Sequence, residues 1–311
     1  MSTLSGLLAL SMPFFLLVLI GFAAARRGIV PTSALGALNA FVLYLALPAM
    51  LCLLGRQWTR DGFAGAALLP LYALASLLLG LMAWAVLARE PSRGARGMAV
   101  LVTLFPNTGF LGVPLLGALL GTASSGPLVA TIVFDLVLTS SICLMLAGAG
   151  ATGLQRALRN PLPYAVLAGV GLGLLDLTLP APLERTLQLL AQAVSPAALV
   201  ALGVALAVPP PAATAAAART ATAQLALLKL VAHPALAAGL GWLALRAGWL
   251  APPQWHLLVL ACALPGAANV ALLAQHLGEG QHLVPRAILL STLGAPLTLP
   301  LAAWWLGVSA A

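Results

Sequence analysis

Residues 97–121 read GMAVLVTLFPNTGFLGVPLLGALLG, an apolar run that Pro106 and Gly109 interrupt near its middle. Proline removes a backbone donor and clashes with the preceding helical turn, and glycine adds backbone freedom. About 20 apolar residues cross a membrane as a helix, so this helix is expected to break near mid-membrane. The backbone groups freed at such a break have to face protein, water or a ligand, because hydrocarbon offers them no partner.

Residues 254–278 repeat this construction and read QWHLLVLACALPGAANVALLAQHLG. Pro265 and Gly266 interrupt this second run, and an asparagine lies beside each break, Asn107 in the first run and Asn269 in the second. When two such helices cross at their breaks, the N-termini of their second halves converge, and each carries partial positive charge. The two runs therefore predict an anion site in which the asparagines supply neutral donors and acceptors.

The composition of the whole chain places these runs in a membrane. Of its 311 residues, 62% are hydrophobic and 6% are charged, and the mean hydropathy is +1.08. A soluble domain carries roughly 25% charged residues, so an ordinary soluble domain is excluded. The net charge of +8 comes from lysines and arginines scattered singly or in pairs, mostly in short loops, which is typical of topology signals and not of nucleic-acid binding.

Apolar runs between charged, proline and glycine residues predict an all-α polytopic membrane protein with ten transmembrane helices. The helices are expected at residues 5–25, 33–54, 64–88, 97–121, 127–149, 161–179, 184–207, 221–246, 254–278 and 284–307. No loop between them is long enough for a soluble domain. The histidines and cysteines show no metal-ligand spacing, so neither a metal nor a cofactor is expected.

The distribution of basic residues predicts the orientation. Loops after the odd-numbered helices hold nine arginines, and the opposite side holds four. Because cytoplasmic loops are enriched in Lys and Arg, both termini are expected on the periplasmic or outer side. The first apolar run has no basic region before it, so it is interpreted as a retained span and not a cleaved signal. A composition rich in Ala, Leu and Arg suggests a bacterial inner membrane.

The chain also contains an internal repeat. Leu47-Pro48-Ala49 in the second helix is matched by Ser195-Pro196-Ala197 in the seventh, and the two broken helices are the fourth and the ninth. Residues 1–150 and 151–311 are therefore expected to form two five-helix repeats. Because five is odd, the second repeat runs through the membrane inverted. Inverted repeats with interrupted helices at matching positions indicate a secondary transporter whose site lies at the repeat interface.

Both breaks carry a family resemblance. FPNTGFLGVP at residues 105–114 resembles the NTGFxGxP signature of the auxin efflux carrier family of membrane transporters. LPGAANV at residues 264–270, with Ala274-Gln275, is similar to that family's second signature. The resemblance implies crossing of the broken fourth and ninth helices at the substrate site. It also implies a scaffold of helices 1, 2, 6 and 7, against which a transport unit of helices 3–5 and 8–10 moves like an elevator.

The resemblance further implies a substrate class and binding positions. Members carry organic anions, which are auxin in plants and malonate, malate or similar carboxylates in bacteria. A homodimer through the scaffold is implied as well. Gly266 stands where many members have a bulkier small residue, which is expected to leave more room beside the break. The binding positions carried over from the family are Pro106, Asn107, Thr108, Gly109, Pro265, Gly266 and Asn269, with Asn39 and Gln275 as weaker candidates.

Two charged residues fall inside predicted spans and are candidates for proton or sodium coupling. Asp135 lies in the fifth helix, where a carboxylate is costly unless it is paired or neutral, so it is expected to face the protein interior. Lys229 lies in the eighth helix. Either its side chain extends to the interface, or it pairs with Asp135 or with carbonyls at a helix break. His233 follows one turn later and is a candidate to titrate with Lys229.

Three alternatives to an organic-anion carrier differ from it in features that the sequence shows. A ten-helix drug/metabolite exporter is also built from five-helix repeats, but it is expected to have both termini inside and to lack the twin breaks. An intramembrane protease needs a GxSG or HExxH string, and the sequence contains neither, so no enzyme activity is expected. A structural or receptor role would leave the broken helices without a purpose.

Overall fold

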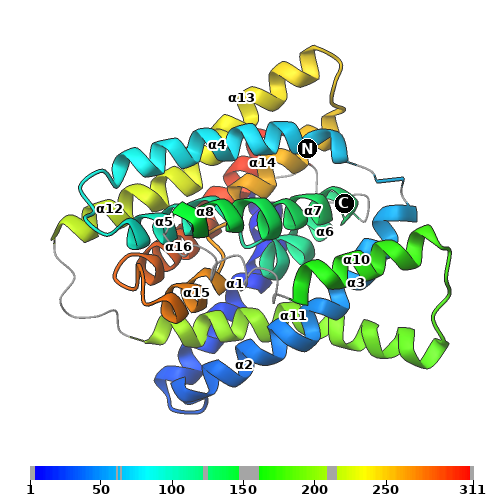
Figure 1. Ribbon diagram of the computed structural model, residues 1–311, viewed down its shortest axis with the longest axis horizontal. Helices are drawn as coiled ribbons and strands as arrows, with labels where there is room; N and C mark the ends of the chain where they lie inside the picture. Colours follow the sequence, from blue (N-terminus) through cyan, green and yellow to red (C-terminus); the bar gives the residue numbers. More distant parts are fainter. Residues whose placement is uncertain are drawn as a thin grey trace.

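The computed structural model describes residues 4–60, 62–63, 65–121, 125–146, 161–208 and 216–308. Within these ranges the protein consists of helices joined by short connections (Figure 1). The described residues contain no strand, and their isolated β-bridge joins Pro106 to Gly266. The expectation of an all-helical protein is therefore met in the part of the chain that the structure describes.

Several of the predicted spans are interrupted helices. The N-terminal half contains α1 (Leu4–Arg26), η1 (Thr32–Ala34), α2 (Leu35–Phe41), η2 (Val42–Ala46), α3 (Leu47–Arg60), η3 (Ala66–Leu68), α4 (Leu69–Val86), α5 (Arg93–Leu104), η4 (Thr108–Gly112), α6 (Val113–Leu120), α7 (Ser125–Phe134), η6 (Asp135–Thr139) and α8 (Ser140–Leu146). The C-terminal half contains α10 (Pro161–Leu174), α11 (Ala181–Ala207), α12 (Ala216–Leu227), η7 (Leu228–Ala232), α13 (His233–Arg246), α14 (Pro252–Ala263), α15 (Asn269–Leu277) and α16 (Val284–Trp305).

Helix length and hydropathy identify a polytopic membrane protein. Among the described residues, six continuous helical stretches are long and apolar enough to cross a bilayer: 4–26, 32–60, 66–86, 181–207, 218–246 and 284–305. Shorter apolar helices cover 108–120 and 161–174. That all ten predicted runs cross the membrane as two inverted repeats stays a prediction.

Two helix pairs pack unusually closely, α1 against α11 and α3 against α10 (Figure 1). A Cβ added at Gly169 of α10 would collide with the Cys52 carbonyl of α3, and one added at Gly203 of α11 would collide with the Val18 carbonyl of α1. Small residues allow such backbone approach in membranes, where van der Waals contact drives helix association. Arg56 of α3 also reaches Glu184 of α11 at 3.2 Å. Together, α1, α2, α3, α10 and α11 form one packed group, which we call the α3–α10 group.

The remaining long helices form a second group. α4 packs on α5 and α13, α13 on α14, and α16 on α12 and α14. π-helical turns interrupt several spans, and three of them hold the polar residues discussed below: η4 begins at Thr108, η6 begins at Asp135, and η7 contains Lys229. A π turn leaves the regular i to i−4 bonding pattern and often marks a functional position.

Candidate functional site

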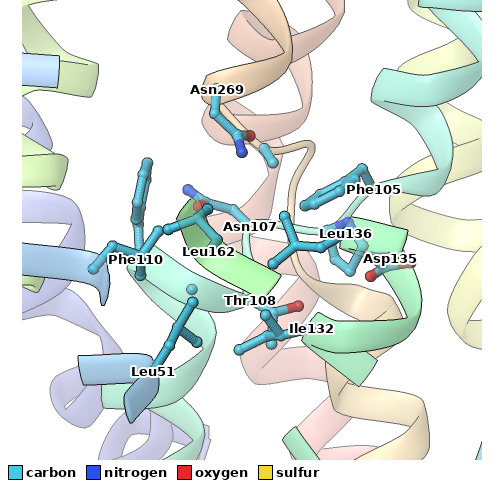
Figure 2. Close-up of a pocket in the computed structure, with 14 residues that line it drawn as sticks. Leu51, Phe105, Asn107, Thr108, Phe110, Ile132, Asp135, Leu136, Leu162 and Asn269 are labelled. Atoms are coloured by element: carbon cyan, nitrogen blue, oxygen red, sulfur yellow. The ribbon is translucent and has the colours of Figure 1, made fainter. Parts of the chain in front are cut away.

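The two helix breaks meet and bond to each other. The first break separates α5 from η4, and the second separates α14 from α15. The Asn107 backbone N–H donates to the Pro265 carbonyl over 2.8 Å, and the Ala267 N–H donates to the Phe105 carbonyl over 3.0 Å. Backbone groups that the prolines free from one helix are thus satisfied by the other helix. Figure 2 shows these crossing segments next to the labelled side chains.

Gly266 has a different environment from the one expected. Its N–H donates to the Ser291 hydroxyl of α16 over 3.2 Å, and that hydroxyl donates to the Ile288 carbonyl over 3.1 Å. A Cβ at Gly266 would lie 2.8 Å from the Val102 carbonyl of α5. The prediction that Gly266 leaves room for substrate is therefore wrong, because its missing side chain faces the backbone of α5 and adds no space to the site.

A cavity of about 30 Å³ lies beside the crossing (Figure 2). Its walls are mostly apolar, and they combine Leu47, Leu51 and Leu162 from the α3–α10 group with residues of the second group. Its polar side chains come from both breaks and from η6. Figure 2 shows Asp135 on one side of the crossing backbone and Phe110 with Leu51 on the other. The polar lining side chains are Asn107, Thr108, Asp135 and Asn269.

Three of these side chains present unpaired polar atoms. Asn107 Nδ2, Thr108 Oγ1 and Asn269 Oδ1 are buried and have no hydrogen-bond partner among the described residues. An unsatisfied buried polar atom costs roughly 1–3 kcal/mol, so such atoms are rare without a ligand or water to bond. Three of them around one cavity are therefore available to bond a ligand or water there.

Helix termini add partial positive charge at the same place. The half-helix η4–α6 begins at Thr108, and α15 begins at Asn269. The first backbone N–H groups of a helix have no partner within it, and they carry the positive end of the helix dipole. Two such termini at one cavity favour an anion.

Asp135 is the acidic member of the lining. The residue is 1% exposed. The Tyr72 hydroxyl of α4 donates to its Oδ2 over 2.6 Å, and the Thr139 hydroxyl donates to its Oδ1 over 3.0 Å. The expected interior position of Asp135 is thus observed. Its carboxyl group lies beside a cavity whose other features attract anions.

Lys229 is buried and does not extend to an interface. Its side chain is among the largest that are fully buried, with 1% exposure. Nζ donates to the Leu104 carbonyl over 3.4 Å and lies 3.0 Å from His233 Nδ1. Leu104 ends α5, where the break at Pro106 leaves carbonyls without intrahelical donors, and a cation is favourable at a helix C-terminus. Of the alternatives for Lys229, contact with a helix-break carbonyl is the one observed.

Tyr72 lies between Asp135 and His233, the histidine that is next to Lys229. Its ring lies 6.2 Å from the His233 ring, centroid to centroid, and His233 Nδ1 lies 3.0 Å from Lys229 Nζ. We call Tyr72, Asp135, Thr139, Lys229 and His233 the Asp135–Lys229 cluster. The sequence signal for Tyr72 is a polar aromatic residue within an otherwise apolar span, because a buried tyrosine hydroxyl needs a partner.

Not every predicted site residue lines the cavity. Pro106, Asn107, Thr108, Gly109 and Asn269 do. Pro265 and Gly266 lie in the crossing backbone without lining it. Asn39 is half-buried in α2 and does not line the cavity, whereas other residues of the same predicted span do. Gln275 belongs to α15, and its side chain lies outside the described part of the structure.

Comparisons with known proteins identify the family of the chain. A family model described as "Membrane transport protein" matches residues 8–155 and 150–303. The chain is 31% identical to a protein of Rhizobium meliloti (strain 1021) named "Putative malonate transporter", over 94% of this chain and 92% of the relative. It is 26% identical to "Uncharacterized transporter YfdV" of Escherichia coli (strain K12), over 96% of each chain. With both signature breaks and a matching family model over most of its length, the chain belongs to the auxin efflux carrier family of membrane transport proteins.

Proposed function

We propose that this protein is a secondary carrier of small organic anions, with its binding site at the crossing of the two broken helices. The observation that supports this most directly is the group of unpaired polar atoms on Asn107, Thr108 and Asn269, placed where two helix N-termini converge. Mono- or dicarboxylates such as malonate, malate or auxin-like acids fit this chemistry, because a carboxylate accepts several hydrogen bonds. The name of the Rhizobium relative favours malonate as the first compound to test.

The size of the cavity supports movement during transport. About 30 Å³ accommodates a few water molecules and is less than a dicarboxylate needs. Leu47, Leu51 and Leu162 close it from the α3–α10 group. Entry of a substrate therefore requires this group to separate from the helices that carry the breaks. The proposed elevator motion, of helices 3–5 and 8–10 against helices 1, 2, 6 and 7, supplies that separation.

We further propose that transport is coupled to protons through Asp135. An ionised carboxylate beside the cavity repels a bound anion, and a proton on Asp135 removes this repulsion. Substrate and proton then bind together, so uptake into proteoliposomes is expected to rise as the external pH falls. Asp135→Asn keeps the shape without the charge and is expected to give uptake that no longer varies with pH. An unchanged pH profile in this variant, or a dependence on sodium alone, would contradict proton coupling through Asp135.

A thermal-shift screen of the purified protein tests the substrate class. We expect one class of carboxylate to raise the melting temperature, since a ligand at 100 times its Kd stabilises by about 2.7 kcal/mol. The panel contains malonate, malate, monocarboxylates, aromatic acids, sodium and neutral amphiphiles. A shift with cations or neutral amphiphiles alone would contradict the anion proposal and favour the drug/metabolite exporter. Accessibility of a C-terminal tag from the outer side separates the same two alternatives, because the proposed orientation places both termini there.

A further inference from the structure

A second hollow, separate from the cavity at the crossing, lies between α13, α14 and α16. Its volume is about 760 Å³, within the range of ligand sites. Five of its residues come from α13, as two adjacent pairs and one tryptophan that recur every four positions, so they share one helix face. The lining residues are Pro234, Ala235, Ala238, Gly239, Trp242, Trp255, Val259, Ala302 and Trp305. We call this hollow the tryptophan groove.

Small residues form the floor of the tryptophan groove and tryptophans form its walls. A Cβ added at Gly239 would meet no atom within 4 Å, so the space above this residue is open. Trp255 is held in place, because its indole N–H donates to the Ala238 carbonyl over 3.1 Å and its ring packs edge-on against Trp305. Trp242 and Trp305 are 49% and 63% exposed. The tryptophan groove is thus an apolar hollow that is open at the surface of the protein.

In a bilayer, the tryptophan groove faces the hydrocarbon core and the boundary between hydrocarbon and lipid headgroups. Residues 218–246 and 284–305, which supply two of its three helices, are candidate membrane spans. Tryptophan is enriched where hydrocarbon meets the headgroups, so its three tryptophans place one end of the groove at that boundary. An acyl chain is therefore the apolar molecule that reaches this groove.

A cation lies at the same end. Arg246 is exposed at the end of α13, one turn beyond Trp242, with its guanidinium 5.8 Å from the Trp242 ring centre. Among the described residues no acidic group pairs with it. An arginine beside an apolar groove at the interface is complementary to a lipid phosphate, to which its planar fork of N–H groups can donate two hydrogen bonds.

We infer that the tryptophan groove binds one glycerophospholipid, with an acyl chain between α13, α14 and α16 and its phosphate at Arg246. This site is independent of the proposed anion site, since the two share no lining residue. It is also independent of which substrate is carried.

The test measures phospholipid that stays bound to the full-length protein through extended detergent washing, by native mass spectrometry. Gly239→Leu places a side chain in the groove at a position where a Cβ meets no atom within 4 Å, and it is expected to lower the retained phospholipid at least fivefold. Gly171→Leu is the matched control, because a Cβ at Gly171 of α10 also meets nothing within 4 Å and the residue lies far from the groove in sequence and in helix packing. It is expected to retain phospholipid like the wild type. Trp305→Ala removes an exposed wall and is expected to behave like Gly239→Leu.

Headgroup selection is tested by competition between phosphatidylglycerol and phosphatidylcholine in mixed micelles. The wild type is expected to prefer the anionic lipid about fivefold, the factor that one cationic side chain contributes near anionic lipid. Arg246→Gln is expected to abolish this preference, and Arg219→Gln, at an exposed arginine of α12, is expected to keep it. Equal phospholipid retention by wild type, Gly239→Leu and Trp305→Ala would overturn the site. An unchanged preference in Arg246→Gln would overturn the assignment of the phosphate.

Discussion

Asn107→Ala is expected to abolish stabilisation by substrate and transport while leaving the protein folded and monodisperse. The Asn107 amide nitrogen has no partner among the described residues, so its removal breaks no hydrogen bond there. The bond that joins the two breaks uses the backbone N–H of Asn107, which alanine retains. Because a buried unpaired amide costs roughly 1–3 kcal/mol, the ligand-free variant is expected to be as stable as the wild type or more stable.

Thermal unfolding with and without malonate measures both effects, and uptake into proteoliposomes measures transport. Thr103→Ala is the matched control in the same broken helix, because the Thr103 hydroxyl is buried but donates to the Ala99 carbonyl and does not line the cavity. It is expected to lose about 1 kcal/mol of stability and to keep the response to ligand. Normal uptake by Asn107→Ala would show that the binding site lies elsewhere.

Lys229→Met is expected to destabilise the folded protein by about 1–3 kcal/mol, the range for leaving a buried hydrogen-bonding group without its partner. The substitution withdraws the hydrogen-bond donor from the Leu104 carbonyl and from His233 Nδ1. It also removes the buried cation of the Asp135–Lys229 cluster. A charged group within a membrane span is costly, so removing one charge of the cluster is expected to change the cost of the other.

A double-mutant cycle separates the charge interaction from simple loss of packing. Adding Asp135→Asn to Lys229→Met removes the second charge, so the double variant is expected to recover at least about 1 kcal/mol relative to Lys229→Met alone. Thermal unfolding in detergent measures all members of the cycle. Arg219→Met, at an exposed cation near the start of the same span, is the control and is expected to change stability by less than about 0.5 kcal/mol. Strict additivity of the two substitutions would contradict electrostatic coupling within the Asp135–Lys229 cluster.

The local chemistry of the chain was enough to predict the main helices and the two breaks. Pro106 and Pro265 interrupt helices because a missing N–H and a steric clash act within one turn. Asn107, Asn269 and Asp135 could be chosen as site residues because polar groups inside apolar runs need a function or a partner. The family followed from the same short segments and agrees with the relatives.

Other features depend on which distant segments touch, and these came from the tertiary structure. The sequence could not assign Lys229 a partner, because the Leu104 carbonyl that accepts from it lies 125 residues away along the chain. The closed environment of Gly266 reflects the approach of the α5 backbone, which no local pattern reports. The same is true of the leucines of α3 and α10 that complete the cavity.

The sequence by itself thus determined a polytopic helical membrane protein of the auxin efflux carrier family, its helix breaks, and the polar residues beside them. The tertiary structure decided how the breaks satisfy each other's backbone groups, which side chains share the cavity, and where the tryptophan groove and its arginine lie. The physical reason is one of range. Propensity, hydropathy and proline chemistry act within a few residues, whereas burial, pairing and cavity shape are set by contacts between helices far apart in the chain.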